Sequence, residues 1–313
     1  MTAHAVGPGG RVLLLGRALA KRGVEKTLTS PPVLRALKRR ARGWSVILAY
    51  HNVIPDHEEL TGAHGAHVRL SDFHWQMDLL QEHCAVVPLD ALLDPPDPSG
   101  SFRAALTFDD AYVGTMETAL PELAERGLPA TVFVPSGLVG QGAFWWDELG
   151  ISGWEGERTP LDALRGETQA IRRWARDAGH TARPQGPSQV AATESQIVAW
   201  RDRPEVSFGV HTVGHRNLAR LSSDEVSEEL LQCRRWLEER DLPVSAWVSY
   251  PYGLTSNAVE RVSAGAGFQA GMTITGGVVR GKLTDPFRTP RLIIPAGVTR
   301  ENFLLRIFGV ISS

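Results

Sequence analysis

The sequence contains little cysteine and lacks long apolar runs. Its 313 residues include two cysteines, Cys84 and Cys233, too few for a disulfide framework, so we expect free thiols in a reducing compartment. No run of about 18 apolar residues occurs, which excludes an ordinary transmembrane helix. The N-terminal residues also lack the apolar region and cleavage site of a secretory signal. These absences predict a cytoplasmic protein.

Net charge is also nearly absent, at −2 for the whole chain. This value conceals two regions of opposite sign. Residues 1–43 carry ten Lys/Arg and one acid, Glu25, a net charge of +9, whereas residues 44–313 carry 23 Lys/Arg and 34 Asp/Glu, a net charge of −11. We therefore expect a basic N-terminal arm joined to an acidic body. Nucleic-acid binding is not expected, because the body is acidic and has no recognised binding motif.

The basic arm has the pattern of an amphipathic helix. Ser30 followed by Pro31 and Pro32 is a typical helix start, and apolar residues then recur at helical spacing among basic ones over residues 33–44. Two interpretations stay open. Either the helix lies on an anionic membrane surface, such as the inner membrane face, or it packs on the acidic body with its cations in solvent.

From Trp44 onward, short β-branched runs alternate with helical patterns, which predicts an α/β fold with a mostly parallel sheet. Strands are predicted at residues 46–50, 103–108, 130–134, 206–210 and 246–250, with a weaker one at 271–275. A helix is predicted after Ser222, which forms a capping box with Glu225 and precedes an apolar stripe that includes Cys233.

Chemically useful residues directly follow four of these strands. They are His51, the pair Asp109-Asp110, the pair His211 and His215, and the segment Pro251-Tyr252-Gly253. In barrels of alternating strands and helices, the carboxyl ends of the strands form the active site. We therefore expect these residues to converge.

Their spacing indicates a metal site. His211 and His215 are four residues apart, so a helical turn would place both imidazoles on one face. The adjacent carboxylates Asp109 and Asp110 repel each other unless a cation or a proton lies between them. We therefore expect one of them to bind a metal and the other to act as a base. Alternatively, the acids cap a helix and His51 is a structural histidine. Two imidazoles and one carboxylate also match a non-haem Fe(II) oxygenase, but the second carboxylate favours hydrolysis.

Three segments resemble successive motifs of the polysaccharide deacetylase family, the NodB-homology or carbohydrate esterase 4 group. They are Thr107-Phe108-Asp109-Asp110, His211-Thr212-Val213-Gly214-His215 and Tyr250-Pro251-Tyr252-Gly253. The opening Tyr50-His51-Asn52-Val53 resembles the branch that includes poly-N-acetylglucosamine and other exopolysaccharide deacetylases. The resemblance covers about residues 44–295.

The resemblance implies a distorted (β/α)7-type barrel over residues 44–313 and removal of an acetyl group from an N-acetylated sugar of a glycan or glycan precursor. It implies that Asp110, His211 and His215 hold one divalent metal and that Asp109 is the general base. Zinc is the default metal, and Co, Ni or Fe suit the same ligands. The backbone N–H of Tyr252, after Pro251, is expected to stabilise the oxyanion. A catalytically silent glycan-binding protein is the alternative, and no oligomeric state is indicated.

The chain departs from the family pattern in two places. Ser249 and Tyr250 stand where the family has an arginine, and no histidine follows His215, where the family has its C-terminal acid. In the branch that begins with Tyr-His the upstream histidine replaces that acid, which points to His51. Arg288 or Arg291 is expected to supply the cation near Asp109, or else to contact an anionic sugar or diphosphate, or to form a surface ion pair.

Residues 145–200 are expected to form an insertion beside the barrel mouth. They hold five of the nine tryptophans, namely Trp145, Trp146, Trp154, Trp174 and Trp200. We expect Trp145 to stack on a sugar ring. The alternative is that these side chains anchor an irregular segment.

Overall fold

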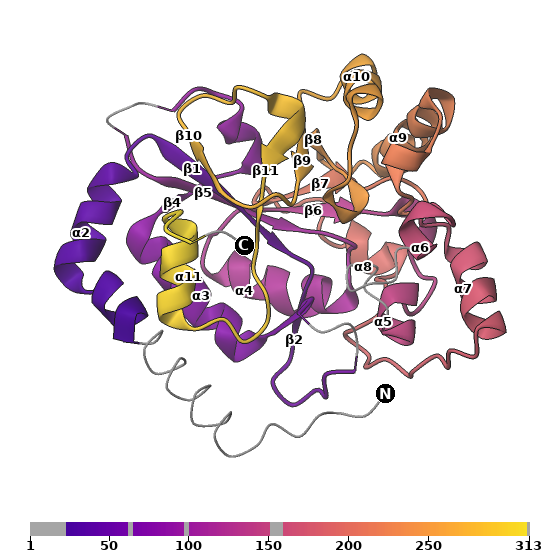
Figure 1. Cartoon of the computed structure of the whole chain (residues 1–313), viewed down its shortest axis with the longest axis horizontal. Helices are drawn as coiled ribbons and strands as arrows, with labels where there is room; N and C mark the ends of the chain where they lie inside the picture. The colour runs from indigo at the N-terminus through magenta and orange to yellow at the C-terminus, as the bar shows by residue number, and fades with distance from the viewer. Residues whose placement is uncertain (1–22, 62–64, 97–99, 151–158, 312–313) are drawn as a thin grey trace, which may run out of the picture.

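A computed structural model describes residues 23–61, 65–96, 100–150 and 159–311. One curved sheet dominates it (Figure 1), and eight of its strands lie side by side. In sheet order these strands are β10 (Val278–Arg280), β1 (Trp44–Tyr50), β5 (Arg103–Phe108), β6 (Ala130–Val134), β7 (Val206–Val210), β8 (Val244–Ser249), β9 (Ala270–Thr273) and β11 (Thr289–Pro290). All neighbours are parallel except β10, which is antiparallel to β1.

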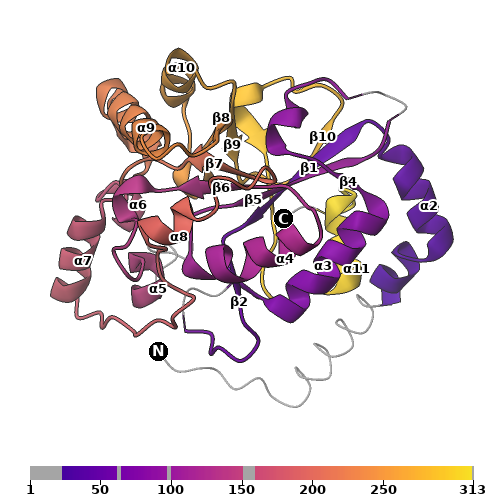
Figure 2. The same cartoon turned by 180° about the vertical axis from the view of Figure 1, so that it is seen from behind.

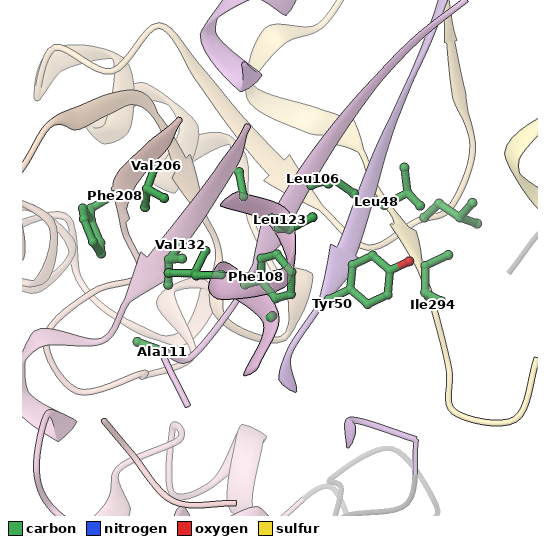
Figure 3. Close-up of a cluster of buried hydrophobic side chains, with 14 of the residues drawn as sticks. Leu48, Tyr50, Leu106, Phe108, Ala111, Leu123, Val132, Val206, Phe208 and Ile294 are labelled. Carbon is green, nitrogen blue, oxygen red and sulfur yellow. The ribbon is translucent and has the colours of Figure 1, made fainter. Parts of the chain in front are cut away.

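The six predicted strands are confirmed, with boundaries that differ by at most two residues. Their composition explains the fold. All five residues of β6 are buried, as are six of the seven in β1, the pattern of parallel strands covered on both faces. Figure 3 shows side chains from neighbouring strands, among them Leu48, Phe108 and Val132, which belong to one core.

A short segment closes the sheet into a barrel. β11 pairs with β9, and β12 (Leu292–Ile293), two residues further on, pairs with β1. The backbone N–H of Arg291, between these two strands, donates to Thr273 O (3.2 Å), and the N–H of Ile294 donates to Ala49 O (3.1 Å). The two edges of the sheet are thus joined through residues 289–294. The predicted distorted α/β barrel is confirmed.

Two further pairings complete the strands. β4 (Ala85–Val86) pairs with β5, and β2 (Asn52–Ile54) pairs with β3 (His67–Arg69) in a small separate sheet. Helices cover the outside of the barrel (Figures 1 and 2): α3 (Leu70–His83), α4 (Leu120–Glu125), α9 (Ser223–Glu238), α10 (Asn257–Gly265) and α11 (Arg300–Ile307). The predicted capping box is confirmed at the start of α9, which buries Cys233 against the core.

The tryptophan-rich segment adds four short helices, α5 (Trp145–Leu149), α6 (Thr159–Asp162), α7 (Thr168–Asp177) and α8 (Glu194–Val198). Its own buried cluster includes Trp145, Leu161 and Ile171, which pack around Tyr112 and Phe144 from the chain before it. The segment therefore shares a core with the loop that follows β5. Trp154 lies outside the described residues.

The basic arm is described only from residue 23. Its helix α2 (Pro31–Arg40) begins after Ser30, as predicted, and Leu34 and Leu37 pack against the barrel core. Its arginines and lysine face outward. α2 therefore packs on the body through Leu34 and Leu37, as the second interpretation expects, and contact of its cations with an anionic membrane surface stays a prediction. Within the described residues, no helix has the length and hydropathy needed to cross a membrane.

A substitution at Gly209 of β7 tests how closely the barrel interior is packed. A Cβ atom at this position would overlap the ring of buried Phe133, so Gly209→Ala should lower the free energy of unfolding by about 1–3 kcal/mol. Gly265→Ala is the control, since a Cβ there meets nothing within 4 Å and alanine favours the helix, a gain of up to about 1 kcal/mol. Urea unfolding measures both. Equal stability of the two variants would contradict this packing.

Candidate metal centre

The carboxyl ends of β1, β5 and β7 place five predicted site residues around one cavity of about 430 Å³. These residues are His51, Asp109, Asp110, His211 and His215. The turn Pro251–Gly253 follows β8 and brings Tyr252 to the same cavity, whereas Pro251 is buried and is not among the residues that line it. The convergence predicted from the strand ends is therefore observed.

Three of these side chains form a compact ligand set. Asp110 Oδ1 lies 3.5 Å from His211 Nε2 and 3.3 Å from His215 Nε2, and all three side chains are buried. A tetrahedral ion with ligand distances of about 2.1 Å would separate neighbouring ligand atoms by about 3.4 Å. The spacing of the three residues therefore suits one divalent ion.

The protonation chemistry of the set also fits a metal. Asp110 Oδ1 is buried and accepts no hydrogen bond from the described residues. Burial, then the carboxylates of Asp109 and Asp147, raise the pKa of Asp110 well above its ordinary value. Burial lowers the pKa of His211 to about 4 and that of His215 well below its usual range. Neutral imidazoles are metal ligands, and a cation would relieve the charge on Asp110.

The loop between the two histidines is held from outside. His211 Nδ1–H donates to Ser249 O (2.8 Å), which leaves Nε2 directed at Asp110. Glu229 of α9 accepts hydrogen bonds from the backbone N–H groups of Val213 (2.8 Å) and Gly214 (2.9 Å). The role of Glu229 was not predicted from the sequence, because a glutamate within a helix gives no signal that its carboxylate binds a distant loop.

Backbone strain concentrates at this site. Asp110, Thr212, His215 and Tyr252 have positive φ angles of 70°, 68°, 54° and 59°. Such left-handed conformations cost a non-glycine residue of order 1–3 kcal/mol, so they persist only where the surroundings enforce them. Thr212 contributes to this enforcement, since its Oγ1 accepts from the N–H of His215 (2.9 Å).

Asp109 is electrostatically different from its neighbour Asp110. Arg291 donates to both oxygens of Asp109, at 2.8 and 2.7 Å, and its side chain is 0% exposed. Burial alone would raise the pKa of Asp109, but the charge of Arg291 and that of His211 lower it below the ordinary range. Ser249 Oγ also donates to Asp109 (3.2 Å). Asp109 is therefore ionised and stands outside the ligand set.

Of the two candidate arginines, only Arg291 reaches Asp109. The expectation for Arg288 at this place is wrong, because its guanidinium donates to Glu260 (2.6 Å) and Asn257 (2.5 Å) at the surface. Arg288 instead forms the surface ion pair that was its alternative. Arg291 is enclosed and is directed at Asp109, which argues against its contact with an anionic sugar.

His51 is fixed through its backbone. Thr115 Oγ1 donates to His51 O (2.9 Å), and the next residue, Asn52, is buried and donates to Ser188 O (2.8 Å). Thr115 begins a π-helical turn (Thr115–Ala119), a feature that recurs at functional sites. Burial lowers the pKa of His51, while the charge of Asp109 opposes this.

Trp146, rather than Trp145, lines the cavity. Trp145 is 1% exposed and belongs to the core of the insertion, so the expectation that it stacks on a sugar ring is wrong. The Trp146 ring lies 4.5 Å from that of His215. Trp146 Nε1–H donates to Tyr112 Oη (2.8 Å), which in turn donates to Asp147 (2.7 Å). The sequence-based choice of Trp145 over its neighbour Trp146 was wrong, because which of two adjacent tryptophans lines the cavity depends on tertiary packing.

Comparisons with known proteins agree with this fold. The polysaccharide deacetylase family model matches residues 97–271, more than half of the chain, and the chain belongs to that family. No curated protein matches its sequence.

Solved structures of low sequence identity share the fold. Streptococcus pyogenes deacetylase PplD in complex with acetate is 19% identical, with a TM-score of 0.60 over 84% of this chain and 98% of that one. IcaB from Ammonifex degensii is 18% identical, with a TM-score of 0.59 over 86% and 98%. A de-N-acetylase from Aggregatibacter actinomycetemcomitans is 15% identical, with a TM-score of 0.55 over 80% and 95%.

Removing Arg291 should destabilise the protein strongly. Arg291→Met leaves Asp109 as a buried, unpaired charge, so we expect the free energy of unfolding to fall by about 3–5 kcal/mol. The control Arg288→Met removes an exposed ion pair and should cost at most about 1 kcal/mol. Urea unfolding at neutral pH measures both.

The ion pair between Asp109 and Arg291 also predicts how the free energy of unfolding depends on pH. Because the folded-state pKa of Asp109 is depressed, the contribution of the pair is fully present above about pH 4 and is lost as the pH falls further. The stability gap between wild type and Arg291→Met should therefore narrow in acid. A stability difference that widens in acid would contradict the conclusion that Arg291 keeps Asp109 ionised. So would a loss of stability in Arg291→Met no larger than that in Arg288→Met.

Proposed function

We propose that the protein is a metal-dependent carbohydrate N-deacetylase that removes the acetyl group from an N-acetylated sugar of a glycan or glycan precursor. One observation carries this: the cavity that holds the Asp110, His211 and His215 ligand set also holds an ionised carboxylate, Asp109, outside it. A Lewis acid together with a base can activate water and stabilise the oxyanion, two requirements of amide hydrolysis, and family membership supports this reaction class.

Each residue of the cavity has a separate role in the proposed deacetylation. Asp110, His211 and His215 would hold the ion, which supplies a Lewis acid and lowers the pKa of water when bound. Asp109, kept ionised by Arg291, takes a proton from the attacking water. His51 gives a proton to the amide nitrogen as the C–N bond breaks and acetate departs. The backbone N–H of Tyr252 stabilises the negative charge that develops on the acetyl oxygen.

The walls of the cavity suit a sugar with an acetyl group. Trp146 and Tyr252 flank His215, and Ile274 and Ile293 add apolar surface. Aromatic faces stack on the C–H face of a sugar ring, and the aliphatic side chains would exclude water around the acetyl methyl. The named relatives are consistent with this, since PplD is a deacetylase solved with acetate and another is a de-N-acetylase.

The zinc form is the one we propose, since two imidazoles and a carboxylate with an open position are typical of catalytic zinc. Co, Ni or Fe would fit the same donors. An oxygenase that uses Fe(II) has no evident need for Asp109, and a silent glycan-binding protein has no need to keep Asp109 ionised. Both alternatives are outcomes of the experiment that follows.

Asp109→Asn should remove catalysis and spare the metal. We expect acetate release from a panel of N-acetylated polymers, lipid-linked sugars and nucleotide sugars to fall by about 10²–10⁴-fold, because asparagine cannot take the proton. Metal content per chain, measured by atomic emission, should stay unchanged. The control Asp202→Asn alters an exposed aspartate and should be as active as wild type.

Three outcomes would overturn this reading. Full activity of Asp109→Asn would eliminate Asp109 as the base. Oxygen uptake with Fe(II) and no acetate release would favour the oxygenase. Glycan binding without acetate release from any substrate in wild type would favour the silent member.

His51→Gln should impair turnover far more than metal content. A proton donor contributes about 10²–10⁴-fold to such a reaction, so kcat should fall by that order with metal content unchanged. His74→Gln is the control, because His74 lies on the outer helix α3 and pairs with Glu122. Loss of metal in His51→Gln would make His51 a ligand instead.

A further inference from the structure

A second hollow, of about 560 Å³, lies between α2, the end of α3 and the start of β5. Its lining includes Ala85 and Phe102, at the amino ends of β4 and β5. The metal centre follows the carboxyl ends of the strands, so the two hollows lie toward opposite ends of the barrel. Figure 1 shows α2 on one side of the molecule and the insertion helices α5 and α7 on the other.

Four cations line this hollow. Arg35, Lys38, Arg39 and Arg42 are spaced three or four residues apart and so share one face of α2 and its extension. The opposite face, with Leu34 and Leu37, packs against the core, which forces the cations outward. The sequence pattern and the packing together create this basic surface.

In the part of the chain that the structure describes, these cations have no carboxylate partner. Among the described residues, Arg35, Arg39 and Arg42 form no ion pair with a carboxylate, although all three are exposed. Lys38 Nζ donates to the backbone oxygen of Glu82 (2.8 Å), which fixes its ammonium at the rim. Glu82 is the acid among the lining residues, and its carboxylate lies 3.6 Å from His83 Nε2. Among the described residues that line the hollow, four positive charges thus face one acid.

We propose that this hollow binds a phosphate-bearing anion, independently of the metal centre. Guanidinium groups bind phosphate oxygens in a bidentate manner, and three of the four cations are arginines. The volume exceeds that of a single phosphate and accommodates a diphosphate or a phospholipid headgroup. Clustered like charges on one helix face repel each other, and a bound anion relieves that repulsion.

The two sources of this chemistry have different consequences. A soluble diphosphate would be a ligand at a site remote from the metal cavity. An anionic membrane would bind the protein peripherally through α2, with the metal cavity turned away from the lipid. Because the apolar face of α2 is covered by the body, such contact would rest on charge and would weaken as salt is added.

The test compares two matched double variants of the full-length metal-loaded protein. Arg35→Gln/Arg39→Gln removes two cations of the hollow, and Arg173→Gln/Arg176→Gln removes two exposed arginines from α7. The probes are inorganic pyrophosphate by calorimetry and vesicle sedimentation with phosphatidylcholine alone or mixed with phosphatidylglycerol. Each cation near an anionic surface contributes about fivefold, so the first variant should bind about 25-fold more weakly and the second like wild type.

The outcomes separate the sources. Binding of pyrophosphate without vesicles assigns the hollow to a soluble phosphate, and binding of phosphatidylglycerol vesicles without pyrophosphate assigns it to lipid. No binding of either probe overturns the proposal, as does equal loss in both double variants or full binding by Arg35→Gln/Arg39→Gln. Acetate release should be unchanged in the Arg35→Gln/Arg39→Gln variant, so failure here is distinct from failure of the proposed deacetylase activity.

Discussion

The buried pair between Arg291 and Asp109 is the constraint on which the rest of the site depends. Arg291 lies between β11 and β12, the two short strands that join the edges of the barrel. Its fully enclosed side chain reaches the carboxylate of Asp109, the residue that follows β5. The segment that closes the barrel therefore also supplies the buried positive charge beside Asp109. Without the guanidinium of Arg291, the adjacent carboxylates of Asp109 and Asp110 would both depend on the metal ion for a positive partner.

The pair gives Asp109 and Asp110 different chemistry despite their adjacency. The charged guanidinium of Arg291 contacts Asp109 and lowers its pKa, whereas burial and neighbouring acids raise the pKa of Asp110. Asp110 is consequently the carboxylate that gains most from an external cation, and the two imidazoles beside it are neutral. The positive φ angles at Asp110 and His215 show that the surrounding fold enforces this geometry.

The strands, the capping box and the strand-end residues were predictable because each depends on local pattern and on the rule that parallel strands end together. The sequence could not predict that Arg291, and not Arg288, contacts Asp109. The two lie three residues apart in a segment with strands of only two residues, so the path of the chain decides which one enters the barrel. Trp146 and Glu229 were missed for the same reason, since their roles follow from contacts with distant loops.

Metal titration of the metal-free protein tests the central claim most directly. Zinc is added stepwise to chelator-treated protein while acetate release from an N-acetylated substrate is measured. The account predicts no release at the start and a rise that ends at one ion per chain, since the structure offers one set of three ligands among its described residues. Full acetate release by the metal-free protein, or a plateau that requires two ions per chain, would contradict it.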